Sequence, residues 1–292
     1  MPRETLTLKL LRVVENSYRP PEEEVLRLTE LSKLNKLYLA FLRNVNSEML
    51  YRELLLEESK YRWYLRNAME VAKALTELRY AFYKFRRPVG HVSVDLDVLV
   101  HVDDIPEAVR RLKSRGFSVI VVEPYTVTLE RRGFIVDLYT QPSFAWVVYM
   151  DGVRILEECS EDIEINGFPA RGVTREAEVV IAAGHAVYKE HIVLLVDCLT
   201  MWKWASRKTI GLAKELKTLE SIRILMWICD LIEKATLETP TRLPTHLLLK
   251  AYLEKFTNDK TFVVTTPNII KYLVKRRDVG SILFKRITRR SY

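Results

Sequence analysis

The stretch Val92-Ser93-Val94-Asp95-Leu96-Asp97-Val98-Leu99-Val100 decides the fold of this 292-residue chain. Its valines and leucines alternate with other residues from Val94 to Val100, which predicts a β-strand over residues 92–101 with one buried face. Side chains two apart on a strand point the same way, so Asp95 and Asp97 share the opposite face. Two carboxylates so close repel each other, and a divalent cation held between them relieves the repulsion. The stretch therefore predicts a strand that carries a metal site.

A third carboxylate follows in Gly133-Phe134-Ile135-Val136-Asp137-Leu138-Tyr139. This run is apolar except at Asp137, as in an interior strand, where an isolated charge needs a partner or a metal. If the two strands are neighbours, Asp137 joins Asp95 and Asp97 around hard cations, and three carboxylates suit Mg²⁺. The alternative interpretation is that Asp95 caps a turn and Asp137 hydrogen-bonds to the backbone.

The composition is that of a globular protein, with 48% hydrophobic residues, 29% charged residues and a net charge of +8. The positive charge weakly favours polyanionic partners. No stretch approaches the ~20 uninterrupted apolar residues of a membrane span, and the N-terminus lacks the features of a signal peptide. We therefore expect a cytoplasmic protein without a membrane partner.

Cysteine and glutamine usage adds two expectations. The three cysteines, Cys159, Cys198 and Cys229, are widely spaced and form no paired motif, so they are expected to be reduced core residues. Gln141 is the only glutamine, which together with the many charged residues resembles proteins from hot environments.

The order of the patterns divides the chain into a helical region over 1–80, a mixed core over 81–172 and a second helical region over 173–292. In the core, a helix is expected from Asp104, its N-cap, to Gly116, so that Asp103 and Asp104 are not counted as metal ligands. Strands are expected over 118–122, 126–130 and 134–139, and Asn166-Gly167 marks a further hairpin. The pattern predicts an α+β fold, with a small mixed, largely antiparallel sheet and helices on one side.

The C-terminal region is expected to begin with a helix capped by Thr174. Helices are then expected over 179–187, 192–204, 210–235 and 243–256. The end is basic, with one acid, Asp278, among Lys271, Lys275, Arg276, Arg277, Lys285, Arg286, Arg289 and Arg290. Such a tail is either a solvated face or a contact for RNA or DNA.

A strand with Asp-x-Asp, then a helix, then a strand with one more Asp resembles the nucleotidyltransferase superfamily, the fold of DNA polymerase beta. Ser93–Val100 and Ile135–Asp137 carry this resemblance, and Ser93 stands one position earlier than the signature serine. More narrowly, the layout looks like uncharacterised nucleotidyltransferases with helical regions on both sides of the catalytic domain. In those proteins a segment like Lys84–Pro88 precedes the metal strand, and helices like Ala182–Ala186 and Leu194–Asp197 close the site.

The resemblance implies two Mg²⁺ (or Mn²⁺) ions and a nucleoside triphosphate as the donor. Asp95 and Asp97 would hold both ions, and Asp137 would bind the ion that activates an acceptor hydroxyl of unknown identity. Most active members carry a Gly-Ser pair before the metal strand, where this chain has Pro88-Val89-Gly90-His91. The implied nucleotide-binding residues are therefore Lys84, Arg86, Arg87, Gly90, Ser93, His185 and Lys189. The rival hypothesis is a non-catalytic module of this fold that binds nucleic acid or a protein partner.

Overall fold

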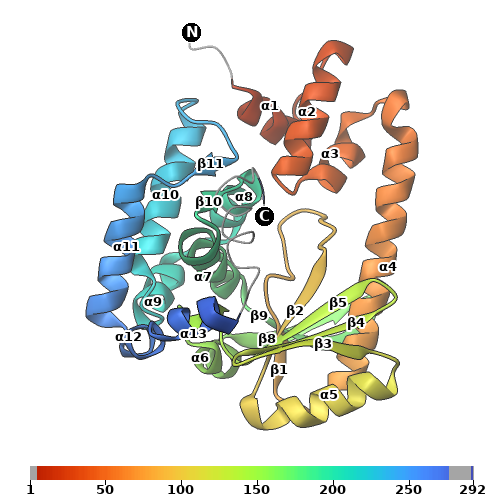
Figure 1. The fold of residues 1–292 in the computed structure, drawn as a ribbon. Coiled ribbons are helices and arrows are strands. Elements are labelled where there is room, and N and C mark those ends of the chain that lie inside the picture. Colours follow the sequence, from red (N-terminus) through yellow and green to blue (C-terminus); the bar gives the residue numbers. More distant parts are fainter. Residues whose placement is uncertain (1–4, 276–290, 292) are drawn as a thin grey trace.

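A seven-stranded mixed sheet forms the centre of the protein, whose computed structural model describes residues 5–275 and 291 (Figure 1). The pairings of β2 with β5 and of β1 with β9 are parallel, and the other four in this sheet are antiparallel. In order across the sheet, the strands are β3 (Ser118–Glu123), β4 (Thr126–Arg131), β5 (Phe134–Tyr139), β2 (Asp95–Val100), β1 (Tyr80–Phe82), β9 (Phe168–Val173) and β8 (Ser160–Ile165). The predicted α+β fold with a mixed, largely antiparallel sheet is confirmed.

The two hairpins that the sequence predicts are present because their turns contain residues that adopt left-handed conformations. Arg132 and Gly133 have φ of 52° and 81° between β4 and β5, and Asn166 and Gly167 have φ of 50° and 78° between β8 and β9. Positive φ at both central residues matches the twist of a two-residue hairpin. Two short two-stranded pairs lie outside the main sheet: β6 (Ser143–Phe144) with β7 (Val147–Val148), and β10 (Ile192–Val193) with β11 (Thr241–Arg242).

Helices precede the sheet and follow it. Before it come α1 (Leu6–Val14), α2 (Glu22–Leu34), α3 (Tyr38–Val45), the short 3₁₀ segment Glu48–Leu50 and the long α4 (Tyr51–Leu75). Within the core region lie the 3₁₀ segment Val102–Asp104, α5 (Ile105–Ser114) and α6 (Gly152–Glu158). After the sheet come α7 (Arg175–Gly184), the π-helical segment His185–Glu190, α8 (Leu195–Trp204), α9 (Arg207–Glu215), α10 (Leu219–Glu233), α11 (Thr245–Asn258), α12 (Lys260–Thr265) and α13 (Asn268–Lys275).

Both faces of the sheet are covered, so the expectation of helices on one side is wrong. Leu96 and Val98 on one face of β2 belong to a core cluster with α4 and α5. Leu99 and Tyr139 on the other face belong to a second cluster with α6, α7 and the helices that follow. The aspartates therefore lie on a covered face of the sheet, where a charge needs a partner.

The N-terminal helices α1–α3 pack against the C-terminal region. The buried Asn35, just after α2, accepts a hydrogen bond from the backbone of Leu195 at 2.7 Å and donates one to the carbonyl of Thr239 at 3.2 Å. Leu10 and Phe41 share the second core cluster with residues of α8 and α10. The division of the chain near residues 80 and 172 stays a prediction.

Local predictions fail in four places. Val94 is 82% exposed because the strand begins only at Asp95. The expected helix over 210–235 is two helices, α9 and α10, separated by Lys217 at φ 57°. The expected helix over 192–204 starts with the strand β10. Asp104 ends a 3₁₀ turn and binds the Arg79 side chain at 2.8 Å instead of capping α5 with its side chain.

The expectation of three reduced cysteines is also wrong. Cys198 of α8 and Cys229 of α10 form a disulfide with Cα atoms 5.4 Å apart, and Cys159 is free and buried. The packing of α8 on α10 brings the two sulfurs together across 31 residues, a separation that corresponds to no local cysteine motif. Among the described residues, no helix combines the length and the apolar character that a bilayer crossing requires.

Candidate metal centre

The three predicted carboxylates converge. β2 and β5 are parallel neighbours in a register that places Asp97 beside Asp137, and Asp95 lies two residues before Asp97 on the same face. One oxygen from each of the three carboxylates lies within 4.8 Å of the others. Asp97 is 6% exposed, and Asp95 and Asp137 are half-buried. The parallel pairing of these two strands is what assembles the cluster.

Hydroxyl groups hold the two outer carboxylates. Ser93 Oγ donates to Asp95 Oδ1 at 3.2 Å, and Thr128 Oγ1 donates to Asp137 Oδ1 at 2.5 Å from the neighbouring strand β4. Tyr139 Oη lies 3.5 Å from Asp137 Oδ2. The hydrogen bonds of Asp137 therefore run to side chains that fix its direction towards the other aspartates.

Lys84 is the immediate partner of Asp97. Its Nζ lies 2.8 Å from Asp97 Oδ2, and it is 5.1 Å from the ring centre of Tyr83 and 5.7 Å from that of Tyr139. Lys84 follows β1, and its backbone is anchored by Glu178 of α7. The carboxylate of Glu178 accepts the N–H of Lys84 at 2.9 Å and that of Arg86 at 3.1 Å.

Burial and the nearby lysines shift the pKa values of the aspartates in opposite directions. Burial raises the pKa of Asp97 to about 6 even though Lys84 lowers it, and the charges of Asp95 and Asp137 raise it further. Burial would also raise the pKa of Asp95, but Lys84, Lys36 and Lys189 together bring it below its usual value. Negative charge in this cluster is therefore costly without cations beside it.

The residues present fit a divalent cation. Three carboxylates offer the oxygen ligands that Mg²⁺ and Mn²⁺ prefer. Asp97 Oδ1 is buried and has no hydrogen-bond partner among the described residues, so the cluster contains an acceptor that the protein itself does not use. Buried polar atoms are rarely left unpaired, which makes this oxygen a natural metal ligand.

The other predicted nucleotide-binding residues between β1 and β2 have different surroundings. Arg86 turns away from the aspartates: its guanidinium pairs with Glu161 and donates to the carbonyl of Val173 at 3.1 Å. Arg87 has a buried Nε without a hydrogen-bond partner in the part of the chain that the structure describes. Gly90 lies against α3, where a Cβ would collide with the guanidinium of Arg43.

His185 and Lys189 come from the π-helical segment. His185 is 7% exposed, and its Nε2 lies 3.4 Å from Glu190 Oε1. Burial lowers the pKa of His185 well below its usual value, so this imidazole is neutral. Lys189 Nζ lies 5.9 Å from the ring centre of Tyr139 and lowers the pKa of Asp95. A π-helical turn is rare and often marks a functional site.

Lys36 and Glu178 were missed at the level of sequence. Lys36 lies in the turn after α2 at φ 55° and faces Asp95; burial lowers the pKa of its ammonium to about 8. No local pattern distinguishes Lys36 from other helix-end lysines. Glu178 did give a signal, because an acid between Ala177 and Val179 in an apolar helix needs a buried partner.

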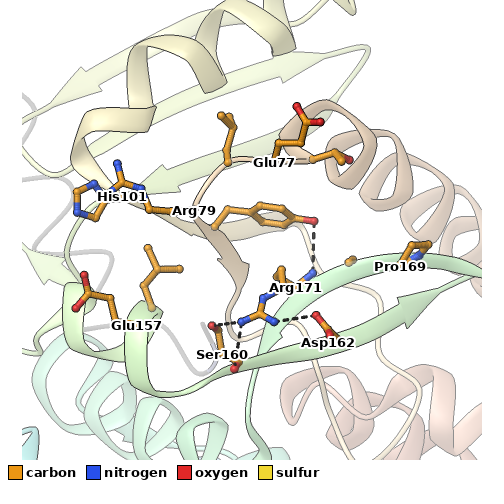
Figure 2. A pocket seen from close by; sticks show the side chains of 13 residues that line it. Glu77, Arg79, His101, Glu157, Ser160, Asp162, Pro169 and Arg171 are labelled. Carbon is orange, nitrogen blue, oxygen red and sulfur yellow. Dashed lines mark hydrogen bonds and ion pairs between the residues drawn. The ribbon is translucent and has the colours of Figure 1, made fainter.

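A cavity of about 530 Å³ lies beyond the far end of β2, next to His101 (Figure 2). A strand of this length places it ~20 Å from Asp95. Arg171 is bound there to Asp162 at 2.8 Å and to Ser160 Oγ at 2.7 Å. Because its two arginines, Arg79 and Arg171, are already paired with Asp104 and Asp162, this cavity is a weaker candidate than the aspartate cluster.

The predicted basic tail is described only in part. Lys271 and Lys275 lie in α13, and Lys275 Nζ is 5.6 Å from the ring centre of Trp146. Arg276, Arg277, Lys285, Arg286, Arg289 and Arg290 lie outside the described residues.

Neither protein-family models nor curated proteins give a match to this chain. Among solved structures, a crystal structure of ANT(2'')-Ia with adenylyl-2''-tobramycin matches at 15% identity and a TM-score of 0.39, covering 52% of this chain and 95% of that one. A solution structure of the antibiotic-resistance factor ANT(2'')-Ia matches at 13% identity and a TM-score of 0.33, covering 66% of this chain and 91% of that one. We draw no functional conclusion from likeness at this level.

Proposed function

We propose that the protein is a magnesium-dependent nucleotidyltransferase that moves a nucleoside monophosphate from a nucleoside triphosphate to a hydroxyl acceptor. The observation that carries the proposal is the convergence of Asp95, Asp97 and Asp137 on parallel neighbouring strands, with an oxygen on Asp97 that has no partner within residues 5–275. Burying three acids on a covered face of a sheet costs free energy. A metal-dependent reaction would explain why they are there.

In this proposal Asp95, Asp97 and Asp137 hold the divalent ions. The resemblance to the nucleotidyltransferase superfamily implies two such ions. When bound, such ions supply Lewis-acid chemistry that lowers the pKa of the attacking hydroxyl and stabilises the leaving pyrophosphate. Ser93 and Thr128 keep two of the carboxylates aimed at the centre.

The triphosphate is assigned to the lysines around the aspartates, with Arg87 as a further candidate. Lys84, Lys36 and Lys189 all lower the pKa of Asp95, so their charges reach the place where the phosphates would lie. Ammonium groups bind phosphate as point charges, which replaces the missing Gly-Ser loop. Arg86 and Gly90 are less favoured, because their neighbours are Glu161 and Arg43.

A second candidate function is a non-catalytic binding module. The ion pair of Lys84 with Asp97 favours it, because an ammonium at 2.8 Å neutralises this carboxylate without a metal. If that pair is permanent, the aspartates are structural and the basic surface binds nucleic acid or a protein partner. The two functions differ in their response to divalent ions.

The test is incubation of the purified protein with each labelled nucleoside triphosphate, Mg²⁺ or Mn²⁺, and total RNA, with protein and small alcohols as alternative acceptors. Label transfer that disappears in Asp95→Ala and Asp97→Ala, but persists in the matched control Asp103→Ala, supports the enzyme; the Asp103 side chain is 70% exposed and lies in the 3₁₀ segment after the end of β2. No transfer under any condition, together with salt-sensitive nucleic-acid binding that ignores the aspartate changes, supports the module.

A further inference from the structure

An aromatic chamber of about 320 Å³ lies beside the metal centre. The β6–β7 hairpin, the π-helical segment and helices α11–α13 line it, and none of the described residues that line it is charged. Six aromatic side chains line it: Phe144, Tyr149, Tyr188, Tyr252, Phe262 and Tyr272. An uncharged cavity with this many rings suits an apolar, planar ligand.

Ring–ring contacts and hydrogen bonds fix the positions of the aromatic side chains. Tyr188 and Tyr252 meet edge to face with centroids 5.7 Å apart, and Tyr252 and Phe262 are 6.1 Å apart. Tyr252 Oη donates to the carbonyl of Tyr188 at 3.2 Å and lies 3.1 Å from His191 Nε2, which fixes its ring. Because these contacts hold the rings in place, the cavity is a preformed feature of the fold, as small-molecule sites usually are.

Two buried polar atoms on residues that line the chamber or pack against its lining have no hydrogen-bond partner among the described residues. One is the hydroxyl of Tyr188, a lining residue that is 1% exposed, and the other is the indole N–H of Trp146, which does not line the chamber but whose ring packs on the lining residue Tyr272 at 5.4 Å. Trp146 also has a left-handed backbone, with φ 62° in the tight turn between β6 and β7. Such unpaired atoms indicate a ligand with at least one hydrogen-bonding group.

The chamber and the metal centre share a wall. The Tyr149 ring is 6.0 Å from that of Tyr188. Tyr149 also acts on the aspartate site: although burial lowers the pKa of Lys84, the charges of Asp97 and Asp95 and the Tyr149 phenol raise this pKa above its usual value. In the π-helical segment, Lys189 acts on Asp95, and its neighbour Tyr188 lines the chamber.

We propose that this chamber binds an uncharged planar ring that carries a hydrogen-bonding group, as part of a substrate of the transfer reaction. The assignment to a substrate rests on the proposed function, whereas the binding itself does not. The ring belongs either to the nucleobase of the donor or to the acceptor, and both have the same recognition chemistry.

The test uses the full chain without metal or triphosphate, and titrates indole and the four ribonucleosides by calorimetry and saturation-transfer NMR. Leu273→Trp fills the chamber from α13, and Leu249→Trp is the matched control, because Leu249 is 59% exposed on α11 and does not line it. We expect saturable binding to the wild type and to Leu249→Trp, and at least tenfold weaker binding to Leu273→Trp. Thermal unfolding checks that both variants are folded.

Competition between a nucleoside and indole would assign the chamber to the nucleobase, and binding of indole alone would assign it to the acceptor. Absence of saturable binding by every probe, or equal binding to both variants, overturns the proposal. Because the titrations contain neither metal nor triphosphate, a failure of nucleotidyl transfer would leave their result unchanged, so the two proposals fail separately.

Discussion

Glu178→Gln tests whether one buried acid positions the lysine of the metal centre. Glu178 is 1% exposed, and its two oxygens accept the backbone N–H groups of Lys84 and Arg86. Glutamine has the same shape but only one acceptor oxygen, so one of the two N–H groups loses its partner. Leaving a buried donor unpaired costs about 1–3 kcal/mol, and the backbone of Lys84 becomes free to shift from Asp97.

The same substitution removes one contribution to the pH dependence of stability. The direction of this contribution follows from the burial of Glu178. Burial raises the pKa of Glu178 to about 7, above the value of 4.5 expected in the unfolded chain, although Arg87 and the backbone N–H groups lower it. Between these values the folded protein holds a proton that the unfolded chain has lost, so stability falls as the pH rises through this window. At 1.36 kcal/mol per pKa unit, the difference amounts to roughly 3 kcal/mol.

The assay is urea unfolding at pH 5 and pH 8, with nucleotidyl transfer measured in parallel. We expect the wild type to lose ~2.5 kcal/mol more stability between the two pH values than Glu178→Gln does, since only the wild type titrates at this position and pH 5 already lies above the unfolded value. Transfer by the variant should fall at least tenfold. Glu176→Gln, on the same helix, is the control and should behave as the wild type. Parallel pH profiles for Glu178→Gln and the wild type would refute the reasoning.

Three further predictions concern the metal centre and the disulfide. Mn²⁺ at 100 times its dissociation constant should stabilise the wild type by about 2.7 kcal/mol in thermal unfolding, and Asp137→Asn should abolish this gain; an unchanged gain contradicts the ligand assignment. Lys84→Met should cost ~3–5 kcal/mol at pH 8 in metal-free urea unfolding and less at pH 5, where Asp97 is protonated because its pKa is about 6; equal costs would mean that the ion pair contributes nothing. Cys198→Ser should lower stability by about 3–4 kcal/mol, the loop-closure value for a separation of 31 residues, and should no longer respond to reductant, whereas Cys159→Ala should keep the reductant sensitivity of the wild type; wild-type unfolding that is insensitive to reductant would contradict the disulfide.

The central strands and the aspartate cluster could be predicted because both follow from short-range patterns. Period-two alternation identifies β2 and a continuous apolar run identifies β5, the two-residue period of a strand fixes which side chains share a face, and Gly133 and Gly167 mark the turns. Whether β2 lies beside β5 depends on the order of strands in the sheet, which a single strand does not encode. The structure supplies that order, with Asp97 paired to Asp137.

What could not be predicted depends on contacts between distant segments. β1 is only three residues long, and its identity as a strand comes from pairing with β2 and β9. The disulfide needs α8 packed on α10, and the break between α9 and α10 needs a left-handed Lys217 that helix periodicity does not reveal. In each case tertiary packing overrides a local preference.

The position of Lys36 changes how the N-terminal helices are interpreted. The notion of a helical region that merely precedes the catalytic core does not explain why a lysine from the α2–α3 turn faces Asp95. The side chain of its neighbour Asn35 makes hydrogen bonds with Leu195 and Thr239 of the C-terminal region. These bonds fix the position of the turn. Burying a cation next to an anion is costly unless the geometry is held, and these bonds hold it. The helices before the sheet therefore contribute Lys36 to the candidate metal centre, and removing them should abolish any activity that depends on it.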